Sequence, residues 1–424
     1  MEIDVLHQLF LKCNTICTDT RKIKKNDLFF ALKGDNFNGN SYAEKALELG
    51  AKYAVIDESE YYTSSQTIVV DNTLNTLQEL ATFHRNYLKT PIIALTGSNG
   101  KTTTKELINT ILSQKYITTA TIGNLNNHIG VPLTLLSLTE ETEIGIIEMG
   151  ANHQKEIKFL CSISQPDFGL ITNYGKAHLE GFGGVEGVIK GKSEMYDFLI
   201  NHDKTIFING NDAIQVDKTK NANTFSFGNS KEDMVINFIE ANPFVICNFE
   251  DEIIHSQLIG DYNFTNIAYA ITIGSYFKVD TKAIKNAIEN YIPKNNRSQI
   301  INKNSNKIIL DAYNANPSSM QAAISNFEKQ TGNKIAILGD MFELGNDAKV
   351  EHQYIVDLAI SSNIDKIIFV GENFNGIVIN SIKSSKYSSF ESFKNSSEIL
   401  ELKNTTILIK GSRGMALERI LDII

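Results

Sequence analysis

Tryptophan is absent from the sequence, and only six prolines and four cysteines occur in 424 residues. The cysteines, which are Cys13, Cys17, Cys161 and Cys247, form no C-x-x-C pair. We therefore expect free thiols, buried rather than catalytic, in a protein of a reducing compartment. Long apolar runs are also missing, because none approaches the ~18 residues that a membrane span needs. The sequence predicts no membrane insertion.

Positive charge is in deficit too, with 40 Lys and Arg against 49 Asp and Glu and a net charge of −9. Binding to a nucleic-acid backbone demands clustered Lys and Arg, so we expect no nucleic-acid partner. The first residues, Met1 to Val5, are acidic and lack the charge pattern of a signal peptide. The prediction is a cytoplasmic protein, taken to be a monomer.

The length exceeds that of one typical domain, and 42% apolar with 21% charged residues is an ordinary globular composition. We predict an α/β fold of three domains: a small N-terminal α/β domain, a central P-loop domain with a parallel sheet, and a C-terminal Rossmann-like domain. The predicted boundaries are 1–88, 89–297 and 298–424.

The most informative stretch has the sequence Thr-Gly-Ser-Asn-Gly-Lys-Thr at residues 96–102. It follows a short apolar strand, residues 92–95, and precedes a helical pattern, which is the layout of a phosphate cradle. Glycines allow backbone N–H groups to converge on an anion, and the helix N-terminus adds partial positive charge. The alternative is a plain turn before an amphipathic helix, and the first glycine of the usual P-loop motif is replaced by Leu95. The predicted nucleotide ligands are Gly97, Ser98, Asn99, Gly100, Lys101, Thr102 and Thr103.

Two further polar positions follow predicted strands of this central sheet. Glu148 lies near the end of the apolar strand 144–150, where a carboxylate can hold Mg²⁺ beside a phosphate cradle. The alternative is a carboxylate that merely leaves the core at a strand end. His178 lies in the loop after the strand 168–172 and is either solvated or part of the same edge. Lys190 and Lys192 belong to a predicted helix, 185–199, where lysines normally face water.

Other segments are assigned more coarsely. Residues 18–21 are interpreted as a solvated turn or a cationic grip on a nucleotide-like ligand, and residues 34–40 as a loop. Short strands between 205 and 259 suggest an antiparallel flank, and Asn263 or Asn266 could cap the helix that follows or contact a base. In the third domain, strands at 307–310, 335–338, 367–370 and 407–409 end in polar loops, and no G-x-G-x-x-G motif indicates a dinucleotide.

Taken together, these loops resemble the Mur ligase family, the ATP-dependent enzymes that form amide bonds in bacterial peptidoglycan synthesis. The phosphate cradle and the loops of Glu148 and His178 are similar to the family in general. The stretches 123–134, 311–320, 338–345 and 410–414 are similar to members that add D-alanyl-D-alanine to UDP-N-acetylmuramoyl-tripeptide. The resemblance runs from residue 18 to the last strand.

The resemblance implies a role for each domain. The N-terminal domain would bind the UDP end of the substrate, the central domain ATP with two Mg²⁺ ions, and the C-terminal domain the incoming dipeptide. It implies catalytic or metal-binding roles for Lys101, Thr102, Glu148, His178 and Lys192, and contacts to adenine, phosphate and ribose for Asn266, Arg297 and Asp311. The implied substrate contacts are Thr20, Arg21, Asn38, Gly39, Asn126, Asn127, Tyr313, Asn314 and Arg413.

The family also carries a carbamylated lysine that bridges metal ions, four residues before an aromatic. Lys192 with Tyr196 fits that spacing, whereas Lys190 does not. Two positions depart from the family pattern. Lys176 stands where relatives often have proline, which puts the shape of the His178 loop in question, and Ala312 stands at a variable position.

Two alternatives for the function remain open. One is another Mur-type or folylpolyglutamate-type ligase, and the other is a P-loop nucleotide switch without ligase activity.

Overall fold

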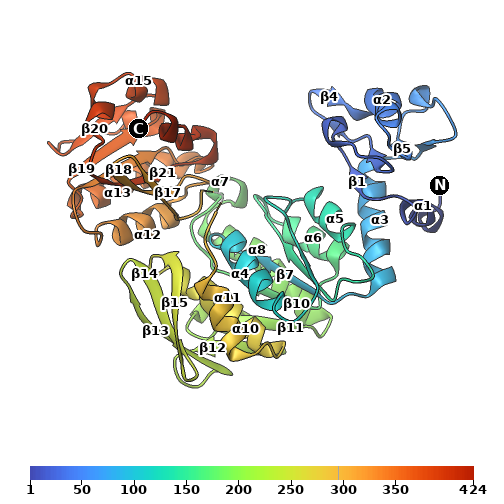
Figure 1. Cartoon of the computed structure of the whole chain (residues 1–424), viewed down its shortest axis with the longest axis horizontal. Coiled ribbons are helices and arrows are strands. Elements are labelled where there is room, and N and C mark those ends of the chain that lie inside the picture. Colours follow the sequence, from blue (N-terminus) through green and yellow to red (C-terminus); the bar gives the residue numbers. More distant parts are fainter. Residues whose placement is uncertain (295) are drawn as a thin grey trace.

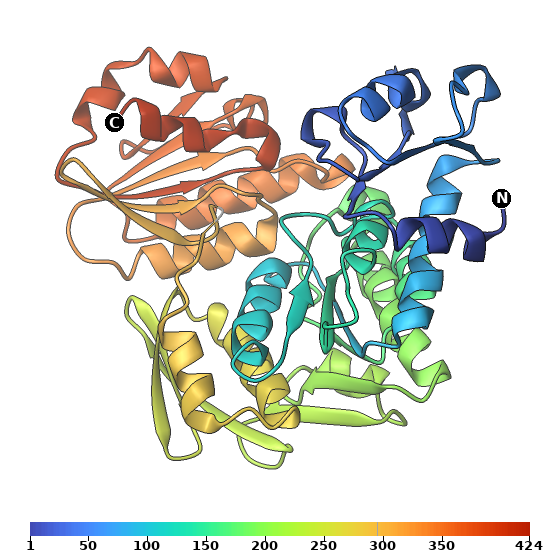
Figure 2. The same ribbon diagram turned by 45° about the vertical axis from the view of Figure 1, so that its right-hand side comes forward.

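The chain folds into three α/β domains that follow one another along the sequence (Figure 1). The computed structural model describes residues 1–294 and 296–424. In both views the N-terminal and C-terminal domains lie on opposite sides of the same end of the central domain (Figures 1 and 2). The predicted fold class is confirmed.

The N-terminal domain is built on a parallel sheet with the strand order β1-β2-β5-β6. The predicted loop at 34–40 is not purely irregular, since it contains half of the small hairpin β3–β4 and leads into a 3₁₀ turn. The elements are α1 (Ile3–Phe10), β1 (Ile16–Cys17), β2 (Leu28–Phe30), β3 (Lys33–Gly34), β4 (Phe37–Asn38), α2 (Ala43–Glu48), β5 (Tyr53–Ile56), β6 (Thr67–Val69) and α3 (Thr73–Leu88).

Helix α3 connects this domain to the central one. It begins at Asn72, whose side chain accepts the backbone N–H of Asn75 at 2.8 Å, and it ends at Lys89 in the left-handed region. Leu77 and Leu80 are fully buried, because α3 packs on α1 and also on α5 and α6 of the central domain. A single helix therefore spans the junction of the two domains (Figure 2).

The central sheet has the strand order β15-β14-β13-β12-β11-β10-β7-β9-β8. Strands β7, β9 and β10 are parallel neighbours with apolar residues on both faces, as expected for a sheet covered by helices on each side. The antiparallel flank is limited to β13, β14 and β15. The assignment of residues 205–208 to that flank is wrong, since β11 pairs in parallel with β10 and β12. The hydrophobic run alone carries no information about strand direction.

Helices cover both faces of this sheet (Figure 1). The helices and strands of the central domain are β7 (Ile92–Thr96), α4 (Lys101–Leu112), β8 (Thr118–Ala120), α5 (Gly130–Leu135), β9 (Ile144–Glu148), α6 (Glu156–Ser164), β10 (Phe168–Ile171), α7 (Leu179–Phe182), α8 (Val185–Asn201), β11 (Thr205–Asn209), α9 (Ala213–Lys218), β12 (Thr224–Gly228), β13 (Met234–Ala241), β14 (Phe244–Phe249), β15 (Glu252–Ile259), α10 (Asn263–Tyr276) and α11 (Thr281–Glu289).

The C-terminal sheet has the order β16-β17-β21-β18-β19-β20, parallel except for β16. The sequence interpretation did not include β16 and β20, both edge strands with polar residues. The elements are β16 (Gln299–Lys303), β17 (Asn306–Asp311), α12 (Pro317–Phe327), β18 (Lys334–Gly339), α13 (Ala348–Ser361), β19 (Lys366–Val370), α14 (Glu372–Asn375), β20 (Ser384–Tyr387), α15 (Phe390–Lys394) and β21 (Thr406–Lys410).

Candidate active site

A cavity of about 720 Å³ lies where the central and C-terminal domains meet. The loops after β7, β9 and β10 line it from the central domain, and the loops after β17, β18 and β21 line it from the C-terminal domain. Both sheets therefore contribute the carboxyl ends of their parallel strands, the edge at which open α/β sheets bind ligands.

The cradle loop forms one wall of this cavity. Gly97 has φ +143° and Gly100 has φ +78°, and a Cβ at Gly100 would lie 2.3 Å from the Asn266 side chain, so glycine is required at this position. Helix α4 starts at Lys101, whose Nζ donates to the Gly97 carbonyl at 2.8 Å. Burial lowers the pKa of Lys101, Arg297 lowers it further, and Glu148 opposes the shift. Among the described residues, the ammonium group is thus paired with loop carbonyl oxygens.

Ser98 and Asn99 hold the cradle in place rather than projecting freely. The Ser98 hydroxyl donates to the Gly175 carbonyl at 2.7 Å, and the Asn99 backbone N–H donates to Asn173 at 3.1 Å. Asn99 Oδ1 accepts the amide of Asn316 from the C-terminal domain at 2.8 Å. The cradle is therefore tied to the loop after β10 and to the neighbouring domain.

Glu148 is an acidic residue at the end of β9 that lines the cavity. Its side chain is 1% exposed, and Oε1 accepts the Asn126 amide at 2.8 Å. Its second oxygen, Oε2, is buried without a hydrogen-bond partner in the described part of the chain. Because β7 and β9 pair with Leu95 opposite Glu148, this oxygen lies at the end of the strand beside the cradle. A buried, unpaired carboxylate oxygen that lines a cavity is a suitable cation ligand.

Lys192 on α8 is 1% exposed, whereas Lys190 is exposed. The expectation that both lysines face water is wrong for Lys192, because positions two apart on a helix point in different directions. Its Nζ donates to the Ala151 carbonyl at 3.0 Å and lies 4.9 Å from the centre of the Phe182 ring. Burial, and then the charge of Lys101, hold the pKa of Lys192 well below its ordinary value.

The His178 loop bridges the two domains. His178 Nδ1 pairs with Glu343 of the C-terminal domain, and this contact lowers the pKa of the Glu343 carboxyl. Lys176 donates through Nζ to Glu351 at 2.6 Å and through its backbone N–H to Ser318 at 2.9 Å. Lys176 thus makes an interdomain ion pair.

The C-terminal domain contributes a cationic and aromatic wall. The Arg297 guanidinium stacks on the Tyr313 ring at 3.8 Å, and its Nε lacks a partner within the described residues. Asp311 accepts the Lys410 ammonium at 2.5 Å, as the register of β17 and β21 places them side by side. Asn314 also lines the cavity. Arg413 is largely exposed and pairs with Glu418 at 2.7 Å.

Asn266 and Asn127 line the cavity, but their side chains already hold structural contacts. Asn266 accepts the Thr104 hydroxyl at 3.1 Å and donates to Asn263 at 2.8 Å. The proposed cap of α10 by either asparagine is wrong, because the cap position is Tyr262 and no side chain caps the helix. Asn127 accepts the backbone N–H of Gly130 at 2.9 Å.

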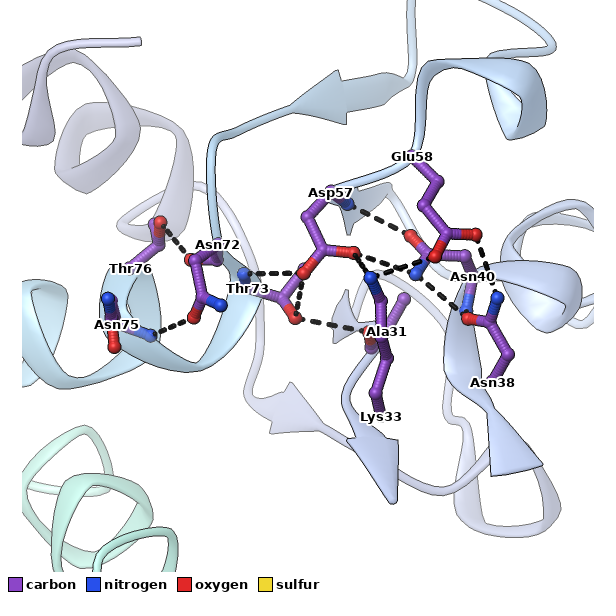
Figure 3. Close-up of polar contacts among 10 residues, drawn as sticks. All are labelled: Ala31, Lys33, Asn38, Asn40, Asp57, Glu58, Asn72, Thr73, Asn75 and Thr76. Carbon is purple, nitrogen blue, oxygen red and sulfur yellow. Dashed lines mark hydrogen bonds and ion pairs between the residues drawn. The ribbon is translucent and has the colours of Figure 1, made fainter. Parts of the chain in front are cut away.

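The four N-terminal candidates lie outside the residues that line the cavity. Arg21 and Thr20 belong to a 3₁₀ turn, and the exposed Arg21 side chain pairs with Asp19 at 2.8 Å. Asn38 donates to Glu58 at 2.7 Å, within a network in which Lys33 bridges two carboxylates (Figure 3). A Cβ at Gly39 would lie 2.2 Å from the Leu32 carbonyl, so glycine there permits close packing.

Some lining residues escaped the sequence interpretation. Asn173 and Asp212 line the cavity from loops after β10 and β11, and their only signal is a polar residue shortly after an apolar strand. Within residues 1–294 and 296–424, no group of three or more His, Cys, Asp or Glu side chains is placed to hold a metal ion. No helix in these ranges is both long and apolar enough to cross a membrane.

Comparison with known proteins decides the family. The Mur ligase family catalytic domain matches residues 12–87, the Mur ligase middle domain residues 95–274, and the Mur ligase glutamate ligase domain residues 296–413. The chain belongs to the Mur ligase family. The resemblance expected from the loop motifs is thereby confirmed.

Individual Mur ligases match along almost the whole chain. The UDP-N-acetylmuramoyl-tripeptide–D-alanyl-D-alanine ligase of Bacillus subtilis is 34% identical over 419 residues, covering 96% of this chain and 92% of the relative. The Escherichia coli ligase of the same name is 33% identical over 421 residues. A crystal structure of MurF from Acinetobacter baumannii superposes with a TM-score of 0.87 at 28% identity, covering 99% of this chain and 97% of the other. MurF from Thermotoga maritima in complex with ADP gives a TM-score of 0.83 at 26% identity, covering 98% and 97%.

Proposed function

We propose that this chain is an ATP-dependent ligase that adds D-alanyl-D-alanine to UDP-N-acetylmuramoyl-tripeptide in peptidoglycan synthesis. The observation that carries the proposal is the shared cavity, in which the cradle and Glu148 face the Arg297, Asp311 and Lys410 wall of another domain. A nucleotide switch has no need of such a wall. The names of relatives that match the whole chain support the same reaction.

The reaction has two steps, activation of the tripeptide carboxylate and attack by the dipeptide amine. The terminal carboxylate of the tripeptide attacks the γ-phosphorus of ATP, the bond to the ADP oxygen breaks, and an acyl phosphate forms. The dipeptide amine then attacks the acyl carbon, and the tetrahedral intermediate loses phosphate and a proton. Phosphoryl transfer depends mainly on positioning and charge neutralisation. Lys101 and the backbone N–H groups of Gly97 to Thr103 would supply both.

Mg²⁺ is part of this proposal, and the residues present fit a cation. The unpaired Glu148 Oε2, the Thr102 hydroxyl and His178 would hold it, with substrate phosphate oxygens completing the coordination. When bound, the ion would neutralise negative charge on the transferring phosphoryl group. His178 would have to leave its contact with Glu343 in order to bind.

A carbamylated Lys192 belongs to the same proposal. An amine reacts with CO₂ only when neutral, and the burial that lowers the pKa of Lys192 favours that form. The nitrogen forms a bond to the carbon of CO₂ and loses a proton, which gives an anion. Carbamylation would replace an unfavourable buried ammonium group by a ligand for a cation.

The remaining substrate contacts follow the domain order. Asn266, Arg297 and Asp311 would meet the adenine, phosphate and ribose of ATP, and Tyr313, Asn314 and Arg413 the dipeptide. Asn126 and Asn127 would face the sugar-peptide. Thr20, Arg21, Asn38 and Gly39 would contact the UDP end, away from the main cavity. Nucleotide-linked precursors are made in the cytoplasm, so we propose a cytoplasmic enzyme that acts as a monomer on the domains defined above.

An acceptor panel tests the function. Phosphate release is measured with ATP and UDP-N-acetylmuramoyl-tripeptide, adding D-alanyl-D-alanine or single amino acids. We expect release only with the dipeptide. Release only with a single amino acid would assign the chain to another Mur-type or folylpolyglutamate-type reaction. ATP binding without any acceptor-dependent ADP formation would indicate a nucleotide switch.

A further inference from the structure

A second cavity, of about 430 Å³, opens beside the first between α3 and α6. Asn127, Gly150 and Glu156 line both cavities, so the two adjoin at these residues. A ligand whose reacting group lies near Glu148 can therefore extend a branch into the second cavity. We call this second space the side cavity.

Part of the wall of the side cavity is apolar. Leu74 of α3 faces Phe159 and Leu160 of α6, and Phe159 is 44% exposed. Such walls suit a chain of methylene groups. Polar groups from Asn75, His128 and Lys155 also line the cavity.

Lys155 and Glu156 bring opposite charges to the side cavity. The Lys155 ammonium group has no hydrogen bond or ion pair to any residue in the described ranges. The acid that lines the cavity, Glu156, is engaged through Oε2 with the backbone N–H groups of Asn152 at 2.6 Å and His153 at 2.9 Å. A carboxylate entering the cavity would meet an unpaired cation.

The backbone fixes Lys155 at this place at some energetic cost. Its φ is +73°, a left-handed conformation that costs a non-glycine residue about 1 kcal/mol. Glu194 of α8 holds the loop by accepting the backbone N–H groups of Lys155 at 2.6 Å and Lys158 at 3.0 Å. Glycine or asparagine would relieve the strain, so a lysine here indicates a use for its side chain.

We propose that the side cavity binds the side chain of the third peptide residue and selects one that ends in a carboxylate, as in diaminopimelate, over lysine. The inference rests on the proposed function. The activated carboxyl carbon and this side chain are bonded to the same Cα, so the side chain begins beside the reacting group. Its methylene groups pack between Leu74 and Phe159, and its carboxylate pairs with Lys155. Both side chains carry a distal ammonium group, but lysine lacks the carboxylate with which Lys155 can pair.

The test compares two acceptors in the full-length enzyme, UDP-N-acetylmuramoyl-tripeptide ending in diaminopimelate or in lysine. Phosphate release dependent on D-alanyl-D-alanine gives kcat and KM for each. Lys155→Asn removes the charge and suits the left-handed backbone. We expect it to lower kcat/KM for the diaminopimelate substrate about tenfold, mainly through KM, and to leave the lysine substrate nearly unchanged. Lys155→Arg should retain the preference, and Lys155→Glu should reverse it.

Lys158→Gln is the matched control, because Lys158 is exposed on α6 and does not line the side cavity. An equal loss for both tripeptides, or no loss for either, in Lys155→Asn would overturn the inference. No dipeptide-dependent release by the wild-type protein with either tripeptide would instead refute the proposed function.

Discussion

Two buried lysines have no ion pair with a carboxylate among the described residues. Lys101 and Lys192 both donate to backbone carbonyl oxygens, and the charge of Lys101 disfavours the charge of Lys192. Burying a cation without a counter-ion costs several kcal/mol unless an anion arrives or a proton leaves. Both features fit the proposals above: Lys101 would bind the phosphates of ATP, and Lys192 would lose its positive charge on carbamylation.

At the residue scale we predict that Lys192→Ala lowers kcat for phosphate release by about 100-fold or more, because a cation ligand is lost. The thermal unfolding midpoint should stay close to that of the wild type, since truncation removes a buried charge. Lys190→Ala, a change on the exposed side of the same helix, serves as the control and should be fully active. Full activity of Lys192→Ala would refute the carbamate.

At the scale of elements, α1 and α3 meet through two buried histidines. His7 Nε2 and His84 Nδ1 share a hydrogen bond of 3.0 Å, and His84 Nε2 bonds to the Leu138 carbonyl at 3.0 Å. When His84 is neutral and donates to Leu138, its Nδ1 accepts a hydrogen bond from His7 Nε2. Burial, helped by the charge of His84, lowers the pKa of His7 to about 4, and burial lowers that of His84.

This pair predicts an acid-sensitive junction. Above about pH 6.5, the pKa of His7 in the unfolded chain, the ring is neutral in both states and its full contribution to stability is present. Between about pH 6.5 and about pH 4, the His7 ring is protonated in the unfolded chain and neutral in the folded chain. Lowering the pH over this range therefore reduces the free energy of unfolding by about 1.4 kcal/mol per pH unit. Thermal unfolding measured over this window should show a steep loss for the wild type and a shallower one for His7→Gln. His255→Gln, at an exposed position, should follow the wild type. Parallel curves for wild type and His7→Gln would contradict the prediction.

Local sequence patterns predict some of the helices and strands but not all of their pairings. The cradle and strands β7, β9 and β10 were predictable, because their apolar runs and glycines encode local structure. The direction of β11 and the edge strands β16 and β20 were not, since pairing partners are distant in sequence. The burial of Lys192 and the ion pair of Lys176 with Glu351 depend on packing between segments, which no local pattern records.

At the scale of the whole molecule, the central and C-terminal domains are held together around the cavity. Lys176 pairs with Glu351, His178 with Glu343 and Asn99 with Asn316. These contacts surround the space where water would hydrolyse an acyl phosphate, so their formation would protect the intermediate.

We predict that Lys176→Glu and Glu351→Lys each lower kcat/KM about tenfold by weakening the closed arrangement. The double exchange should recover most of the loss, with a coupling free energy of about 1 kcal/mol. Small-angle scattering with ATP bound should show a larger radius of gyration for each single variant. Strictly additive losses in the double variant would show that the pair does not couple the domains.

Helix α3 sets a fixed length between two ends of the molecule. Its 16 residues correspond to about 24 Å of rigid rod, and β7 begins a few residues after it. If the N-terminal domain binds the nucleotide of the substrate, this helix fixes the distance between the nucleotide site and the site of the reaction. One peptide residue more or fewer shifts the terminal carboxylate by about 3.5 Å along an extended chain. The fold would then select substrates by peptide length, accepting a tripeptide and excluding precursors with one residue fewer or more.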